Sequence, residues 1–174
     1  MRGSQPDADF EAFVGASTRP LLRVAWLLTS DAHDAQDLVQ ETHVRMAARW
    51  ETIRGRDGDP TAYARTVLHR IHIDRWRRRQ RRPERLVAQA PEARVALDDP
   101  DLRLALLAAL ARLTPRQRSV LVLRYLEDRT ETQAAAVLGC SVSTVKSQAR
   151  HALVRLKELN PDLVAELAPA RKEG

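Results

Sequence analysis

Five side chains near the C-terminal end have the chemistry that DNA recognition needs. They are short hydroxyls and cations on one predicted helix: Ser143, Thr144, Lys146, Ser147 and Arg150. Groups of this kind suit base edges and phosphates in a major groove. We therefore predict that this helix contacts duplex DNA; the alternative is an ordinary helical hairpin with a solvated polar face.

The residues before this helix predict how it is held. Thr130 and Gln133 have the spacing of a capping box that begins a short helix, and Gly139 can supply the positive φ that ends it. Ser141 can then cap the next helix. Two short helices joined by such a turn predict a helix-turn-helix.

A second cationic segment lies upstream, where residues 75–82 form the densest charge run in the chain. A helix dipole accounts for one or two cations only, so self-repulsion favours a polyanionic partner over a solvated helix end. Tyr63 and Trp76 are equally compatible with core positions and with stacking on unpaired bases. The same predicted helix carries several groups that could hold such bases: Tyr63, Arg65, Thr66, His69, Arg70 and His72.

An acidic stripe lies on a different predicted helix. Asp34, Asp37 and Glu41 recur at i, i+3 and i+7, with Gln40 beside them. DNA would repel this stripe. It is therefore either a solvated face or a docking surface for a basic protein partner.

The composition limits the class of protein. The 174 residues are 44% hydrophobic, 30% charged and 4% aromatic, which is typical of a soluble protein whose core is built from Leu, Val and Ala. The formal net charge of +6 is concentrated in residues 63–85 and 115–158. Two separated basic segments suggest two contacts with a polyanion.

Several kinds of site and location are excluded or disfavoured. The single cysteine, Cys140, excludes an internal disulfide and a multi-cysteine metal site. His69 and His72 lie near Asp74, but the arginines around them disfavour a metal dication. With no phosphate-binding glycine loop and no nucleophile elbow, we expect no enzyme, cofactor or metal. The absence of a long apolar run predicts a cytoplasmic chain without membrane insertion.

Helical periodicity runs through the chain, with no alternating strand pattern. The predicted fold is all-α, with two small helical domains joined by a flexible linker, the C-terminal one a helix-turn-helix. The expected bounds are 8–82 for the first domain, 83–99 for the linker and 100–159 for the second domain. A short tail, expected to be a frayed helix end, occupies 160–174.

Local signals add three expectations. Pro20 should kink or interrupt the first helix, and residues 52–59 should form a glycine-containing loop. Pro60 should begin a helix that runs to about residue 82, and Pro115 one that runs to about residue 127. The arginines of that last helix are either solvated or bind phosphate: Arg116, Arg118 and Arg124.

Three segments resemble a known family. Residues 34–42 (DAQDLVQET) are similar to the second conserved region of bacterial RNA polymerase sigma factors of the sigma-70 family, and residues 137–147 (VLGCSVSTVKS) to its final region. Residues 73–79 (IDRWRRR) stand where that family has a basic helix end. The resemblance covers about residues 10–158, and the lack of a middle domain resembles the extracytoplasmic-function (group 4) class.

The resemblance implies an alternative sigma factor that binds core RNA polymerase and directs promoter-specific initiation. Docking on the clamp helices of the largest polymerase subunit is implied for Asp34, Asp37, Gln40 and Glu41, and the core contact as a whole is expected to involve the largest and beta subunits. Contacts with the −10 element are implied for Arg54, Arg56, Arg65, His69, Arg70, Arg77 and Arg78. Contacts with the −35 element are implied for Ser143, Thr144, Lys146, Ser147 and Arg150. The implied partners are core polymerase, promoter DNA and an anti-sigma factor, and the free factor is expected to be a monomer.

The sequence also departs from the family pattern. Arg70 stands where many relatives carry asparagine, and Gln148 and His151 stand where arginines are common. These departures predict a changed −10 base preference and −35 contacts that depend on Arg150. The rival hypothesis is a stand-alone helix-turn-helix regulator whose N-terminal lobe senses a ligand or dimerises, and which binds a palindromic site by itself.

Overall fold

The structure is a computed structural model that describes residues 4–55, 58–80 and 100–167. The expected linker, Arg56 and the end of the tail lie outside these residues. Within them the chain forms helices and connecting turns and contains no strand, so the prediction of an all-α fold is confirmed. None of these helices combines the length and the apolar character that crossing a membrane requires.

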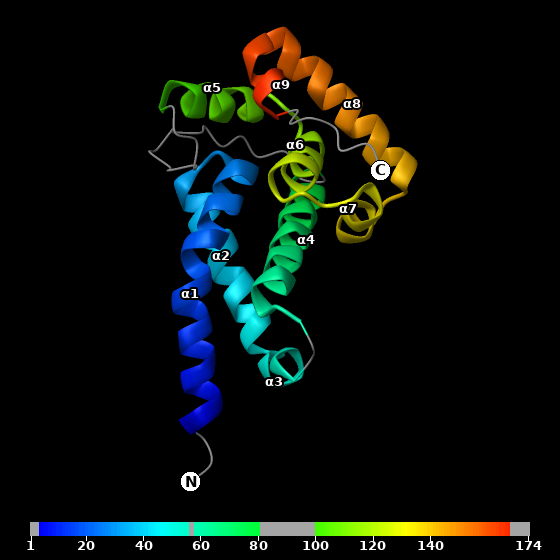
Figure 1. Ribbon diagram of the computed structural model, residues 1–174. Coiled ribbons are helices and arrows are strands. Elements are labelled where there is room, and N and C mark those ends of the chain that lie inside the picture. Colours follow the sequence, from blue (N-terminus) through cyan, green and yellow to red (C-terminus); the bar gives the residue numbers. More distant parts are fainter. Residues whose placement is uncertain (1–3, 56–57, 81–99, 168–174) are drawn as a thin grey trace. The chain divides into compact units, whose positions relative to one another are not determined.

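The helices form two compact units (Figure 1). Residues 27–30, at the end of the first helix, group with the second unit. The first unit otherwise contains α1 (Ser4–Thr29), α2 (Ala32–Ala47), α3 (Trp50–Arg54) and α4 (Pro60–Gln80). The second contains α5 (Pro100–Ala111), α6 (Pro115–Leu121), the π-helix η1 (Val122–Leu126), α7 (Glu131–Leu138), α8 (Val142–Leu159) and α9 (Pro161–Leu167).

In the first unit, α2 and α4 lie side by side. Asp31 caps α2, because its Oδ1 accepts a hydrogen bond from the Asp34 amide at 2.8 Å. Leu38 of α2 and Leu68 and Ile71 of α4 have no exposed surface. Burying side chains of this size contributes about 1.5–3 kcal/mol each, so an apolar seam fixes the register of the two helices.

The first helix passes through Pro20 without a break. Proline cannot donate the backbone hydrogen bond that an interior helical position requires. Leu21 and Ala25, on the following turn, are fully buried. This tertiary packing offsets the lost hydrogen bond, and the expectation of an interruption at Pro20 is wrong.

A short helix, α3, occupies residues that were in part expected to be loop. Trp50 and Ile53 of α3 are buried. The Trp50 ring centroid lies 5.2 Å from that of Phe10 and 4.8 Å from that of Phe13, both on α1. These aromatic contacts join positions far apart in sequence, so a local count of glycines does not detect them.

The second unit begins its helices largely as predicted. Thr114 and Gln117 form a capping box at α6, with both hydrogen bonds at 3.2 Å. The expected single helix to residue 127 is wrong in its last turn, where η1 replaces α-helix and the Glu127 amide donates to the Val122 carbonyl at 2.9 Å. This wider turn keeps both Val122 and Leu123 buried.

The described part of the C-terminal tail is ordered as α9 rather than as a frayed helix end. The Asn160 Oδ1 accepts a hydrogen bond from the Asp162 amide at 3.1 Å, which satisfies one backbone donor at the start of α9. Leu163 is only 1% exposed. One buried leucine and a polar cap therefore explain why the chain continues as helix.

Candidate nucleic-acid interface

The helix-turn-helix of α7 and α8 has the geometry that its sequence predicts. Thr130 Oγ1 accepts from the Gln133 amide at 3.1 Å, and Gln133 Oε1 accepts from the Thr130 amide at 2.9 Å. Gly139 has φ 60° and ψ 46°, a left-handed conformation that favours glycine. The Cys140 amide then donates to the Ala135 carbonyl at 3.1 Å, which closes the turn.

The start of α8 is fixed by a second polar cap. Ser141 Oγ accepts from the Thr144 amide at 3.1 Å and also lies 2.9 Å from the Ser143 hydroxyl. Leu138 and Val145 are buried between the two helices. Leu138 and Val145 therefore close the small core, and the Ser141 cap fixes where α8 begins.

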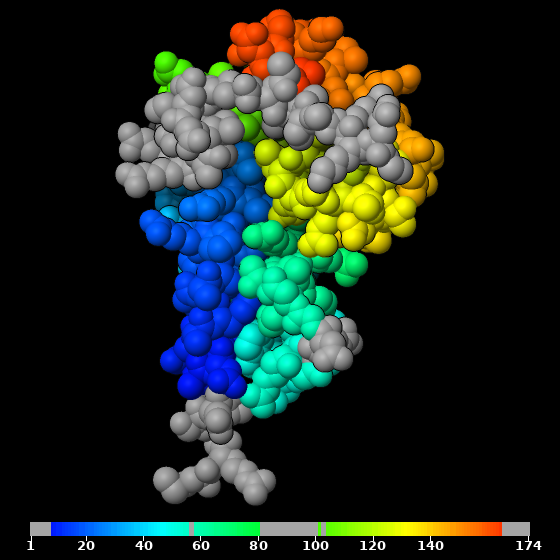
Figure 2. Space-filling model, viewed as in Figure 1, coloured from blue at the N-terminus to red at the C-terminus, as the bar shows by residue number. Residues whose placement is uncertain are grey.

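Three of the five predicted −35 residues are exposed, and two are half-buried. Ser143, Lys146 and Arg150 are exposed, whereas Thr144 and Ser147 are partly covered. Lys146 Nζ lies 3.5 Å from Glu131 Oε2 on α7. No such ion pair is found for Arg150 among the described residues. Figure 2 shows α7 and the start of α8, in yellow to orange, on the surface of their unit.

None of the arginines of α6 and η1 is fully open to solvent: Arg118 is buried, and Arg116 and Arg124 are half-buried. Arg118 is 7% exposed. Its Nε donates to the Leu110 carbonyl at 2.9 Å, and its Nη2 donates to the Leu113 carbonyl at 3.4 Å. Burial lowers the pKa of Arg118 to about 10, so the group is still cationic at neutral pH. Arg124 donates to the Arg129 carbonyl. Arg118 therefore closes the end of α5 and is not available to phosphate.

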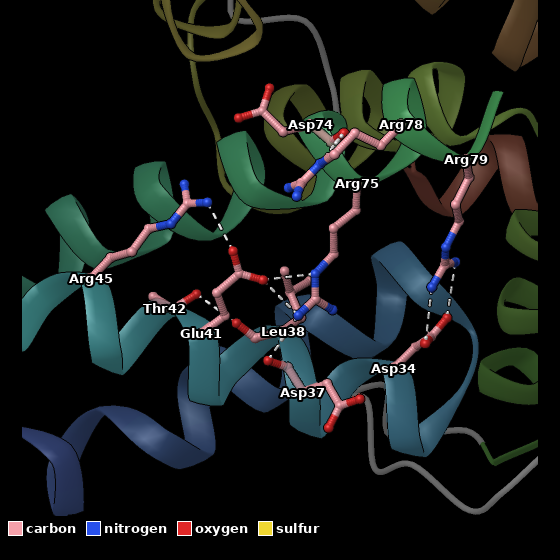
Figure 3. Close-up of polar contacts among 10 residues, drawn as sticks. All are labelled: Asp34, Asp37, Leu38, Glu41, Thr42, Arg45, Asp74, Arg75, Arg78 and Arg79. Atoms are coloured by element: carbon pink, nitrogen blue, oxygen red, sulfur yellow. Dashed lines mark hydrogen bonds and ion pairs between the residues drawn. The ribbon is translucent and has the colours of Figure 1, made fainter. Parts of the chain in front are cut away.

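The acidic stripe of α2 faces the basic end of α4 (Figure 3). Arg75 donates to Glu41 Oε2 from Nη2 at 2.7 Å and from Nε at 2.9 Å. Arg45 donates to the other oxygen of Glu41 at 2.8 Å. Arg79 pairs with Asp34, with both hydrogen bonds at 3.2 Å. We call this set of three carboxylate and guanidinium contacts the charge seam.

The charge seam changes the titration of Glu41. Partial burial acts to raise the pKa of this carboxyl, but the hydrogen bonds and positive charges of Arg75 and Arg45 outweigh it and hold the pKa below its ordinary value. Glu41 is therefore ionised at neutral pH with both oxygens occupied.

Asp37 and Gln40 remain outside these pairs. Both side chains are exposed, and the Asp37 carboxylate points away from the guanidinium of Arg75 (Figure 3). Only the backbone carbonyl of Asp37 accepts from Arg75, at 3.2 Å. Sequence reasoning missed Val44, which is 68% exposed. Val44 lies seven residues after Asp37 and three after Glu41, so the same helical spacing that revealed the stripe places it on that face.

The residues predicted to contact the −10 element do not form one group. Arg70, Arg77 and Arg78 are exposed and Arg65 is half-buried. His69 has no exposed surface, so its side chain is not accessible to DNA in this structure. Its position on α4 faces the apolar core, between fully buried Leu68 and the turn that carries Ile71.

Arg54, also predicted to contact the −10 element, is held by carboxylates within the first unit. Its guanidinium lies 2.9 Å from Asp9 on α1 and 3.0 Å from Glu51 on α3. These contacts link the two helices across an exposed surface. Arg54 would have to leave both carboxylates to bind phosphate.

A pocket of about 350 Å³ opens in the first unit between the end of α2 and α4. The half-buried Tyr63 supplies an aromatic wall, and Val67 and Ala48 supply apolar surface. Arg45 and Arg49 were not predicted to belong to such a site. Arg45 lies in the last turn of α2 and Arg49 just after it, and only the packing of α2 against α4 brings them into the pocket. The lining residues are Arg45, Ala48, Arg49, Tyr63, Val67 and Arg70.

This combination of an aromatic face, apolar surface and guanidiniums fits an unpaired base and its phosphate. The pocket does not fit a metal ion, because three arginine side chains line it. Across the described residues, no group of three or more His, Cys, Asp and Glu side chains could hold a metal ion.

Taken with the helix-turn-helix, these sites define a two-domain, all-helical DNA-binding protein with exposed cationic side chains in both units. Residues 13–82 match the family described as Sigma-70 region 2, and residues 103–156 match Sigma-70, region 4. The chain belongs to the sigma-70 family.

Individual relatives agree with this assignment. The RNA polymerase sigma-E factor of Streptomyces coelicolor is 40% identical over 166 residues, which cover 94% of this chain and 90% of that protein. The ECF RNA polymerase sigma factor SigG of Mycobacterium tuberculosis is 30% identical, over 92% of this chain and 51% of that protein.

A solved structure shares the fold. The sigma factor RpoE from Bartonella quintana, crystallised in complex with the anti-sigma factor NepR, matches with a TM-score of 0.66 and 27% identity over 87% of this chain and 96% of that chain. This chain is therefore an alternative sigma factor of the extracytoplasmic-function class, which directs promoter-specific transcription. Family membership decides against the stand-alone regulator.

Proposed function

We propose that this sigma factor captures an unpaired base of the −10 element in the pocket between α2 and α4. The observation that carries the proposal is the pairing of an aromatic wall, Tyr63, with the guanidiniums of Arg45, Arg49 and Arg70 around one pocket. A base stacked on the ring would leave its phosphate near the arginines. Binding the unpaired base would then couple promoter opening to recognition.

The exposed cations of α4 hold the rest of the −10 strand in this proposal. Arg77 and Arg78 are exposed at the end of the helix, where they could follow a phosphate backbone. Arg65, Arg54 and Arg56 contribute from the same domain, Arg54 after release from Asp9 and Glu51. His69 is left out because it is buried.

The −35 element is bound by α8 in this proposal. Ser143, Lys146 and Arg150 project from the first turns of a helix whose start is fixed by its cap. Thr144 and Ser147 add hydroxyls at the edge of that face. A cationic, hydroxyl-rich helix of this kind suits the major groove.

Core polymerase docks on the outer face of α2 in this proposal. Asp37 and Gln40 are exposed there, and Val44 offers an apolar contact one turn further along. Asp34 and Glu41 border the same face. A partner surface with basic side chains around an apolar residue is complementary to it. The linker would then set the distance between the two promoter contacts, with the domains at 8–82 and 100–159.

An anti-sigma partner is part of the proposal as well. The Bartonella quintana relative was crystallised with its anti-sigma factor. We infer that a protein of that kind binds this chain and keeps it from core polymerase. In the absence of such a partner, the free factor is a monomer.

A selection from randomised duplex DNA tests the proposal. Fragments are recovered with the chain alone, with core polymerase alone and with both together. The proposal predicts two sequence elements at a fixed spacing, enriched only when both proteins are present. Enrichment of a single palindrome by the chain alone would contradict it.

A further inference from the structure

The charge seam places the proposed core-docking face and the proposed DNA-binding helix end in direct contact. We propose that the seam is a switch in which the carboxylates of α2 hold Arg75 and Arg79 until a basic partner binds those carboxylates and releases the two arginines toward DNA phosphates. This inference rests on the proposed function, since it names a coupling between its core-binding and DNA-binding surfaces.

The geometry gives the switch its closed state. Both oxygens of Glu41 are occupied, by Arg75 at 2.7 Å and by Arg45 at 2.8 Å. Asp34 is occupied by Arg79 at 3.2 Å. Arg75 and Arg79 lie near the end of α4. Their neighbours on this helix, Arg77 and Arg78, instead contact Asp74 of α4 itself. In this state the acidic stripe is largely neutralised by the protein's own cations.

The exposure of these groups allows the switch to open. The side chains of Arg79 and Asp34 are 58% and 31% exposed, and those of Arg75 and Glu41 are 24% and 31% exposed. Ion pairs that are this open to solvent are weak. A partner that brings several cations to α2, or a strand that brings several phosphates to α4, can therefore displace them.

The coupling must be reciprocal. If docking on α2 frees two cations for DNA, then DNA on α4 frees Asp34 and one oxygen of Glu41 for docking. The two effects change affinity by the same factor. The chain alone would therefore bind each partner more weakly than it binds that partner when the other is already bound. The buried apolar contacts between Leu38, Leu68 and Ile71 do not depend on the seam, so the helices stay in place when it opens.

A direct test uses the full chain and a labelled oligothymidylate of about 20 nucleotides, without polymerase. The seam variant carries Asp34→Asn and Glu41→Gln. Its matched control carries Glu11→Gln and Asp162→Asn, which remove the same charge from exposed carboxylates outside the seam and the proposed docking face. Fluorescence anisotropy measures affinity over a range of salt, and thermal unfolding by circular dichroism verifies that both variants fold.

The seam variant should bind oligothymidylate about fivefold more tightly than the wild-type chain at low salt, with the control within about twofold of it. The salt slope should steepen by about 0.7 for each released arginine. Equal gains in the seam variant and the control would mean that net charge alone acts, and would overturn the proposal. No gain in the seam variant would overturn it too.

A second arm measures the reciprocal effect on purified core polymerase without DNA. The variant Arg75→Gln/Arg79→Gln frees Asp34 and one oxygen of Glu41, whose other oxygen stays paired with Arg45, and it should bind core several-fold more tightly than the wild-type chain. Its control, Arg19→Gln/Arg23→Gln, removes two exposed cations of α1 and should not. A loss of affinity in the seam variant would contradict the switch. Failure of every variant and of the wild-type chain to bind core would refute the proposed function, while the oligothymidylate arm still decides the switch.

Discussion

Arg75 donates two hydrogen bonds, at 2.7 and 2.9 Å, to a single carboxylate oxygen of Glu41. The two residues are 34 positions apart in the sequence, one in a basic run and the other in an acidic stripe. Each run alone points to a partner of opposite charge. In the folded chain, each is in part the partner of the other, so the charge available to other molecules comes from the residues left outside the pairs.

Asp37 is the carboxylate of the stripe that lies outside these pairs, so we expect it to carry most of the attraction for core polymerase. Asp37→Lys should weaken core binding by about 1–3 kcal/mol, because it places a cation against a basic partner. Glu11→Lys, on the exposed surface of α1, makes the same change of charge and should have little effect. Equal losses in the two variants, measured by titration of labelled chain, would contradict the docking face.

Arg150 is exposed on α8 and should contact the −35 element directly. Arg150→Ala should weaken −35 recognition by about 1–3 kcal/mol if a base-edge contact is lost. Lys157→Ala, in the last turn of the same helix, serves as the matched control. The measurement is holoenzyme binding to promoter fragments with intact and scrambled −35 elements. An Arg150→Ala enzyme that still discriminates between them as strongly would exclude this residue.

Tyr63 supplies the aromatic wall of the pocket in the first unit. Tyr63→Ala should weaken binding of the −10 non-template strand by about 1–3 kcal/mol, the range for stacking of one base. Tyr63→Phe keeps the ring and should retain most of that affinity. The comparison is made on single-stranded and forked promoter DNA with holoenzyme. If Tyr63→Phe loses as much as Tyr63→Ala, stacking is not the role of this side chain.

His43 links α1 and α2 and should make the first unit sensitive to pH. Its ring nitrogen lies 3.0 Å from the Ser17 hydroxyl, and burial lowers the pKa of His43. Because the folded pKa lies below the unfolded one, the unfolded chain binds the proton more readily. The free energy of unfolding therefore falls as the pH drops through the unfolded pKa, by at most about 1.4 kcal/mol per pH unit for one proton.

Urea unfolding at about pH 7.5 and about pH 5.5 measures this contribution. The variant His43→Gln should lose part of the pH dependence, while His33→Gln, on the exposed face of α2, should keep it. An unchanged difference between the two pH values in His43→Gln would show that other groups are responsible.

The local signals in the sequence were sufficient for the helix-turn-helix. Thr130, Gln133, Gly139 and Ser141 act within four residues of their partners, so their types and spacing predict the caps and the turn. The start of α6 at Pro115 was predicted from local signals of the same kind.

Long-range packing decided the features that were not predicted. The helix continues through Pro20 because the next turn is buried, and α3 forms because Trp50 meets two rings of α1. The burial of His69 and the ion pairs of Arg75 likewise depend on how α4 lies against α2. Spacing along one helix cannot show which of its faces another helix covers.

The most direct test of the central claim is promoter-directed transcription. Purified chain is added to core polymerase free of other sigma factors, on a pool of genomic templates, and transcript starts are mapped. The account predicts discrete transcripts that require both proteins and that share two upstream elements at one spacing. Transcription no more specific than that of core alone, with the chain bound to DNA or not, would contradict it.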